Sequence, residues 1–210
     1  MLGLTIMRTA NAGVLLEMDG KRILLDGVCQ SLPPYLGTPS SIKSYLNEEM
    51  PDVLAFTHNH PDHYDGNYEK LYKEKAHRSV YGPLSLTFYE IGNGVKLSLI
   101  KTRHIGKTDI SHVSFVLRGS STVWFMGDAS PVCLKEMAEY DKPDLLIVPF
   151  GFAITPSAWR KAKETGAKKI LLVHMPLKKD DNEGLWEMVE NTTKNDELLF
   201  TLDIGEKISL

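Results

Sequence analysis

Hydrophobic residues along this chain form short apolar runs separated by polar and glycine-containing segments. Two runs near the start, at residues 13–18 and 22–28, lie on either side of Asp19 and Gly20, a pair typical of two-residue β-hairpin turns. From about residue 41, segments with helical periodicity alternate with short apolar runs. The pattern therefore predicts antiparallel strands at the start of the chain, followed by α/β architecture.

The alternation continues almost to the end of the chain. It predicts helices near 41–50, 66–75, 131–139, 156–165 and 183–194, and strands near 52–57, 78–81, 95–101, 112–118, 122–127, 145–149 and 169–173. The glycine-rich segment 92–94 is the best candidate for a seam between two halves, at about 1–94 and 95–210. Because no low-complexity linker occurs, we expect one domain over residues 1–210.

Composition narrows the classes of partner. The chain has 24 basic and 27 acidic residues, a net charge of -3, which argues against nucleic acid and membrane surfaces. The start of the chain lacks a signal-peptide pattern, and no apolar run is long enough to span a bilayer. We expect a cytoplasmic protein without a membrane partner, and a homo-oligomer stays open.

The segment THNHPDHYDG, residues 57–66, follows the apolar run 52–56 and carries the strongest chemical signal. It places His58, His60, Asp62 and His63 within six residues. In a tight loop, the first two side chains can point one way and the last two the other, so that they serve two ions. Imidazole and carboxylate suit Zn²⁺, Mn²⁺ or iron, and the absence of a nearby cysteine argues against a thiolate site.

Two other apolar runs end at a residue that could bind metal. Asp128 follows the run 122–127, and His174 follows the run 169–173. Alone, Asp128 could be a turn or cap residue, and a lone histidine is more often part of the core. Strand ends are, however, where the sites of α/β proteins gather. Three strand ends with metal-competent residues therefore predict one common site.

In this order and spacing, the motifs resemble the metallo-β-lactamase superfamily, and the resemblance extends from Gly13 to His174. It implies a four-layer αββα sandwich of two packed mixed β-sheets flanked by helices. It also implies two divalent ions, with zinc the first expectation and manganese or iron the alternatives. The implied ligands are His58, His60 and His104 for one ion and Asp62, His63 and His174 for the other, with Asp128 touching both. Asp26 corresponds to a supporting aspartate that orients a ligand histidine.

The distal histidine has two candidates, His104 and His112. In the superfamily this ligand leaves a strand end before a short loop, which favours His104 and leaves His112 as a supporting or substrate-side residue. Residues 143–176 are similar to small members that include ascorbate-6-phosphate lactonases. That likeness places Phe150, Gly151 and Phe152 at the pocket mouth, although ordinary packing explains them equally well.

The predicted function is a metal-dependent hydrolase in which a metal-bridging hydroxide attacks a small anionic ester, lactone or phosphodiester. Asp62, Asp128 and Asp26 are the candidate catalytic carboxylates. Substrate contacts, named from closeness in sequence to the ligands, are Tyr64, Arg103, Lys107 and His112. Two alternatives are a di-iron redox protein on the same scaffold and a catalytically silent metal-binding protein. Related flavodiiron proteins carry an acidic residue where this chain has His60, which argues against the first.

Overall fold

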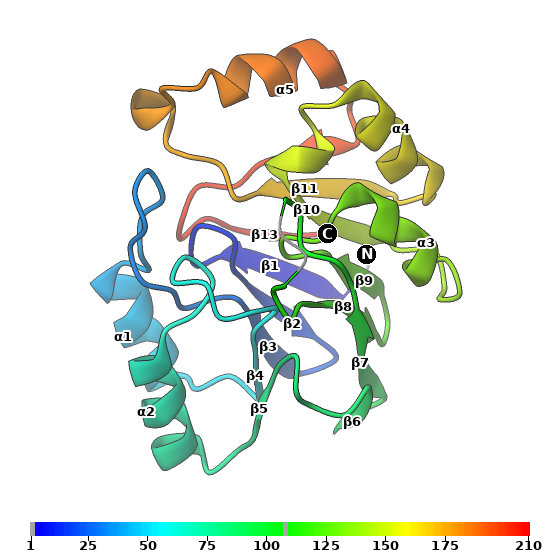
Figure 1. Cartoon of the computed structure of the whole chain (residues 1–210). Helices are drawn as coiled ribbons and strands as arrows, with labels where there is room; N and C mark the ends of the chain where they lie inside the picture. The colour runs from blue at the N-terminus through cyan, green and yellow to red at the C-terminus, as the bar shows by residue number, and fades with distance from the viewer. Residues whose placement is uncertain (1–2, 107–108) are drawn as a thin grey trace.

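Two β-sheets packed face to face form the centre of the molecule, with helices on their outer faces (Figure 1). The computed structural model describes residues 3–106 and 109–210. Both sheets are mixed, since each combines antiparallel and parallel neighbours. The predicted four-layer αββα sandwich is therefore confirmed.

The first sheet has the strand order β13-β1-β2-β3-β4-β5. Its strands are β1 (Leu4–Arg8), β2 (Val14–Met18), β3 (Lys21–Leu25), β4 (Val53–Ala55), β5 (Val80–Tyr81) and β13 (Lys207–Ser209). The predicted hairpin joins β2 to β3, and both turn residues, Asp19 and Gly20, have positive φ angles of 53° and 74°. From β3 to β5 the pairing is parallel. Strand β13 brings the end of the chain back to its start.

The second sheet has the order β12-β11-β10-β9-β8-β7-β6. Its strands are β6 (Phe88–Gly92), β7 (Val95–Lys101), β8 (Val113–Arg118), β9 (Thr122–Phe125), β10 (Leu145–Pro149), β11 (Lys169–Val173) and β12 (Leu199–Phe200). Segment 92–94 is a hairpin turn inside this sheet, because Asn93 and Gly94 adopt positive φ angles that join β6 to β7. The chain therefore changes sheets between Tyr81 and Phe88, earlier than the predicted seam.

Over residues 3–106 and 109–210, five helices and three short 3₁₀ turns cover the sheets. They are α1 (Ser40–Glu48), α2 (Gly66–Ala76), α3 (Leu134–Met137), α4 (Pro156–Glu164) and α5 (Leu185–Thr193), with η1 (Pro131–Cys133), η2 (Phe150–Phe152) and η3 (Lys178–Asp180). Helices α1 and α2 lie beside the first sheet, and α3 to α5 lie beside the second (Figure 1). The helix predicted near 131–139 is instead a 3₁₀ turn followed by one short α-helical turn. No helix in the described part of the chain is long and apolar enough to cross a membrane.

Side chains alternate between two faces along each strand, which produces three hydrophobic clusters. Leu16 and Ile23 point into the core between the sheets, whereas their neighbours Leu15 and Leu24 pack toward α1 and α2. A third cluster lies between the second sheet and its helices. Because both faces of each sheet are covered, most strands are apolar throughout. The residues that follow β3, β4, β7, β9 and β11 supply the polar site described next.

Candidate metal centre

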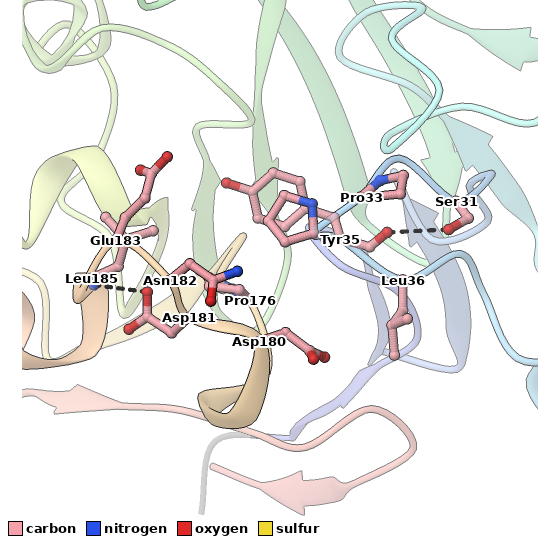
Figure 2. Close-up of a pocket in the computed structure, with 11 residues that line it drawn as sticks. Ser31, Pro33, Tyr35, Leu36, Pro176, Asp180, Asp181, Asn182, Glu183 and Leu185 are labelled. Carbon is pink, nitrogen blue, oxygen red and sulfur yellow. Dashed lines mark hydrogen bonds between the residues drawn. The ribbon is translucent and has the colours of Figure 1, made fainter.

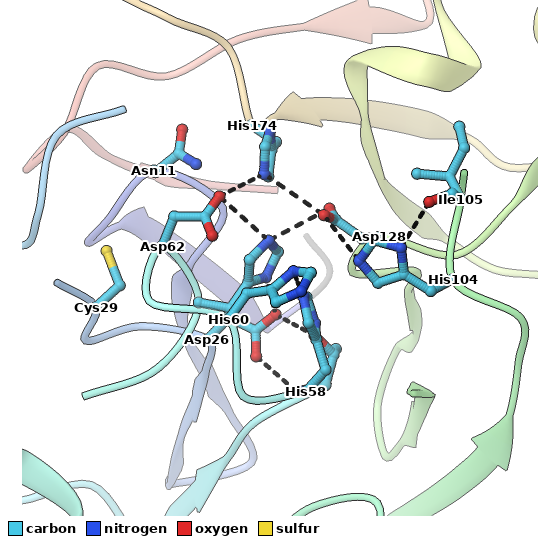
Figure 3. A network of polar contacts seen from close by, with 12 residues as sticks. Asn11, Asp26, Cys29, His58, His60, Asp62, His104, Ile105, Asp128 and His174 are labelled. Carbon is cyan, nitrogen blue, oxygen red and sulfur yellow. Dashed lines mark hydrogen bonds and ion pairs between the residues drawn. The ribbon is translucent and has the colours of Figure 1, made fainter. Parts of the chain in front are cut away.

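Seven histidine and aspartate side chains converge between the loops that follow these strands (Figure 3). They form two groups, and within each group one potential ligand atom per residue lies within 4.8 Å of the others: His58, His60, His104 and Asp128, and separately Asp62, His63 and His174. The Asp128 carboxylate also lies 3.3 Å from Nε2 of His63 and 3.6 Å from Nε2 of His174. Asp128 therefore lies against both groups, and the resemblance implies that it would touch both ions.

The loop after β4 separates its own four side chains into the two groups. The amides of His63 and Tyr64 both donate to the carbonyl of His60, at 3.0 Å each, which closes a tight turn after that residue. The chain then enters α2, whose N-cap Asp65 accepts hydrogen bonds from the amides of Asn67 and Tyr68. This turn places Asp62 and His63 in the opposite group from His58 and His60.

Asp26, at the end of β3, organises one histidine in each group. Its carboxylate is fully buried and accepts bonds from the Thr57 amide at 2.7 Å, the Thr57 hydroxyl at 2.6 Å and Nδ1 of His63 at 2.8 Å. The Thr57 hydroxyl lies 3.0 Å from Nδ1 of His58, and it accepts that proton because its own is donated to Asp26. In both imidazoles Nδ1 is thereby engaged, so Nε2 is the nitrogen that could bind a metal.

The loops after β7 and β9 are joined to each other. A single β-bridge links His104 to Ala129, and the Ile105 amide donates to the Asp128 carbonyl at 2.8 Å. Gly127 is required for this arrangement, because its φ is 54° and a Cβ there would come 2.5 Å from Thr57 Cγ2. The loop that carries Asp128 can therefore pack directly onto the loop that carries His58.

His104, not His112, belongs to the ligand groups. Nδ1 of His112 lies 2.8 Å from the Thr102 hydroxyl, and its Nε2 accepts the Asp128 amide proton at 3.1 Å. Burial lowers the pKa of His112 to about 3, although Asp128 opposes the change, so the ring stays a neutral acceptor. His112 thus supports the Asp128 backbone and has no ring nitrogen left for a metal.

The chemistry of the cluster fits divalent cations. Nε2 of His63 and Nε2 of His104 are buried and have no hydrogen-bond partner among the described residues. Burial by itself would raise the pKa of Asp128, but His174 and His63 hold it well below the ordinary range, so the carboxylate is anionic. A buried carboxylate of this kind needs positive charge beside it, which a bound cation or a protonated His63, whose pKa Asp128 and Asp26 raise despite burial, can supply. The nitrogen and oxygen donors suit Zn²⁺, Mn²⁺ or iron.

The family model of the beta-lactamase superfamily domain matches residues 6–168, which is most of the chain. The chain belongs to the metallo-β-lactamase superfamily. No curated protein matches it in sequence.

Solved structures share this superfamily fold over the whole chain. An isothiocyanate hydrolase from Delia radicum gut bacteria is 14% identical, with a TM-score of 0.71 and 98% of both chains covered. A possible metal-dependent hydrolase from Veillonella parvula is 17% identical, with a TM-score of 0.72 and all of both chains covered. A diiron β-hydroxylase from Streptomyces venezuelae is 13% identical, with a TM-score of 0.63, and the match covers 100% of this chain and 55% of that one.

Of the predicted substrate residues at 150–152, one lies beside a candidate ligand and the other two are buried. Phe150 is half-buried and its ring centroid lies 5.8 Å from that of His174. Phe152 is fully buried in the core beneath the second sheet's helices, so it does not line a pocket mouth, because the η2 turn directs it inward. Gly151 is buried next to Ile105, whose Cδ1 would lie 2.9 Å from an added Cβ.

The remaining predicted substrate contacts are Tyr64 and Arg103, which the structure describes, and Lys107, which it does not. The Tyr64 hydroxyl donates to Glu69 at 2.5 Å and, with His58, lines a cavity of about 670 Å³. Arg103 is exposed, and its backbone bonds to Ser130 and Cys133. Lys107 lies outside the described residues.

The structure also brings residues to this superfamily site that sequence reasoning missed. The ring of Tyr35 meets that of His174 edge-on, at 4.4 Å between centroids. Burial raises the pKa of Tyr35 to about 12, and the carboxylates of Asp128 and Asp62 add to the shift. The Asn11 carbonyl accepts the His174 amide at 3.0 Å. Neither residue lies near a metal motif in sequence, so no local signal could have identified it.

Proposed function

We propose that the chain is a metal-dependent hydrolase that binds two divalent ions. His58, His60 and His104 would hold one ion, Asp62, His63 and His174 would hold the other, and Asp128 would contact both. The observation that carries this proposal is that Nε2 of His63 and Nε2 of His104, both near the Asp128 carboxylate, are buried and have no hydrogen-bond partner among the described residues. It is supported by two fold neighbours, an isothiocyanate hydrolase and a possible metal-dependent hydrolase.

Bound ions would supply an activated water and would polarise the substrate oxygen, so no serine or cysteine nucleophile is needed. The chain's own part is to hold the ligand geometry. Asp26 orients His63 directly and His58 through Thr57. His112 fixes the Asp128 backbone by accepting its amide proton.

We propose a small anionic ester, lactone or phosphodiester as the substrate. Two cations in one cleft attract negative charge at contact distance, even though the whole chain has a net charge of -3. Zinc is the first proposal for the metal, with manganese and iron next, because imidazole and carboxylate donors suit all three. His60 adds an imidazole to the first group, which favours hydrolysis over di-iron redox chemistry.

The test is metal analysis combined with a hydrolysis screen. Protein saturated with Zn²⁺ or Mn²⁺ and then desalted should retain two ions per chain and cleave bis(4-nitrophenyl) phosphate or activated esters and lactones slowly. At most one retained ion would overturn the two-ion centre. Two retained ions without cleavage of any ester, lactone or phosphodiester would overturn the hydrolase. For the redox alternative, the spectrum of the iron-loaded protein should not respond to reductant followed by O₂.

A further inference from the structure

A cavity of about 580 Å³ lies between the loop that follows β3 and the segment that follows β11 (Figure 2). Its apolar lining comes from both sides. Pro33, Pro34 and Leu36 contribute from the first segment, and Pro176 and Leu185 from the second. Pro176 follows His174 by two residues in the chain, whereas none of the described candidate ligands lines the cavity itself.

Tyr35 connects the cavity to the metal centre. Its ring lines the cavity and also packs edge-on against His174, at 4.4 Å between centroids. Figure 2 shows its phenol extending from the loop toward the segment that carries Asn182 and Glu183. A molecule held at the ligand groups and extending past His174 into this cavity would therefore meet Tyr35 first.

The charge of the cavity is negative. Among the described residues that line it there are three carboxylates, Asp180, Asp181 and Glu183, and no lysine or arginine. Asp181 accepts the amide protons of Leu185 and Trp186, at 2.9 Å each, so its charge is partly compensated. Asp180 and Glu183 leave negative charge at the rim. A second anionic group on the substrate would be repelled here.

We propose that this cavity receives the non-reacting part of the substrate, that this part is apolar and carries no negative charge, and that Tyr35 determines specificity by contacting it. The inference rests on the proposed function and refines it. The negative charge of the substrate would then lie at or next to the reacting group, close to the ions, and not in the part that enters the cavity. The portion beyond Tyr35 is an alkyl or aryl group, with or without a cationic end.

Three unreactive phosphonates with the same anchor and chain length test this directly: hexylphosphonate, 6-aminohexylphosphonate and 6-phosphonohexanoate. Their dissociation constants are measured by calorimetry with protein that carries two ions, so the readout does not depend on turnover. The neutral and cationic tails should bind roughly fivefold or more tightly than the carboxylate tail. Equal or tighter binding of 6-phosphonohexanoate would overturn the proposal, as would failure of all three to bind.

Variants then assign the effect to named residues. Asp180→Asn combined with Glu183→Gln should abolish the discrimination against 6-phosphonohexanoate, because both side chains are at the cavity rim. Tyr35→Ala should weaken hexylphosphonate about tenfold by removing apolar contact area. Tyr140→Ala, which truncates a half-buried tyrosine in a different cavity, is the matched control and should bind as the unmodified protein does.

Metal content is measured for each variant, so that lost ions are not mistaken for lost contacts. If Tyr35→Ala retains fewer ions, the test rests on the combined Asp180→Asn and Glu183→Gln variant, because neither of these two side chains contacts His174. Discrimination that survives both rim substitutions, or unchanged affinities in a Tyr35→Ala protein with two ions, would overturn the inference. These outcomes are separate from the hydrolysis screen, since a metal-binding protein without activity could still bind phosphonates.

Discussion

The two ligand groups differ in how firmly the protein holds them. Asp62, His63 and His174 are all buried, and a fully buried carboxylate accepts the Nδ1 proton of His63. In the other group His60 is half-exposed, and its Nδ1 lies 2.9 Å from Nε2 of His58. A site with a buried, hydrogen-bonded framework loses less conformational entropy when it binds an ion. The second group should therefore bind its ion more tightly.

The hydrogen-bond acceptors of the imidazoles also favour tighter binding by the second group. His63 donates to the Asp26 carboxylate, whereas His104 donates to the Ile105 carbonyl at 2.6 Å, and His58 is linked to Asp26 only through Thr57. A charged acceptor makes an imidazole a stronger ligand than a neutral acceptor does. The comparison teaches that one group is held by a buried, hydrogen-bonded framework, whereas the other, with His60 half-exposed, is more open to water.

The largest effect is expected for Asp128→Ala, because this carboxylate lies against both groups. Both ions should be lost on dialysis, and hydrolysis should fall by more than the roughly 100-fold that removal of an outer partner causes. Metal per chain and activity are measured together. Asp141→Ala, which removes an exposed carboxylate paired with Arg118, is the control and should keep both ions. An Asp128→Ala protein with two tightly held ions would contradict the bridging position.

His63→Ala and His60→Ala compare the two groups directly. Each variant should retain about one ion per chain. The ion retained by His60→Ala should bind more tightly than the ion retained by His63→Ala, because in His60→Ala the buried group of Asp62, His63 and His174 is intact. Chelator competition gives both affinities. His63→Ala should also lower the free energy of unfolding, since it strips a partner from the buried Asp26 carboxylate, an effect of about 1 to 3 kcal/mol. The reverse order of affinities would contradict the conclusion that the second group binds its ion more tightly.

Asp26→Asn should weaken the second ion more than the first. Loss of the charged acceptor is expected to reduce affinity there by roughly 10- to 100-fold. Thr57→Val is the matched variant, because it interrupts only the path to His58 and should act on the first ion. The two affinities come from stepwise titration of metal-free protein. If Asp26→Asn weakened the binding of both ions equally, the direct hydrogen bond from His63 to Asp26 would not explain a difference in affinity between the two groups.

The smallest effect is expected for His112→Phe. It leaves the buried Asp128 amide without its acceptor, which should lower the free energy of unfolding by about 1 to 3 kcal/mol, measured with denaturant. Ion affinity should fall by no more than about tenfold, and similarly for both ions, because Asp128 faces both. If His112→Phe lost one ion as completely as His104→Ala does, His112 would be a ligand after all.

The hydrophobic pattern predicted most of the helices and strands, whereas the arrangement of two packed sheets came from the family resemblance. Strands β1, β6, β12 and β13 were not predicted. Strand β13 has three residues and pairs with β1 at the other end of the chain, and β12 has two residues. Such strands are stabilised by pairing with remote segments, so local periodicity gives little signal. The 92–94 turn was mistaken for a seam because glycine and asparagine mark tight turns and linkers alike.

The sequence by itself determined the identities of the clustered side chains. The spacing of His58, His60, Asp62 and His63 confines them to one tight turn, and Asp128 and His174 directly follow strand segments that the apolar pattern marks. Tertiary structure alone decided which residues surround them. His112 is tied to Thr102 and Asp128, Phe152 is in the core, and Tyr35 lies against His174. Spacing constrains neighbours in the chain, whereas contacts between distant segments depend on how the sheets and loops pack.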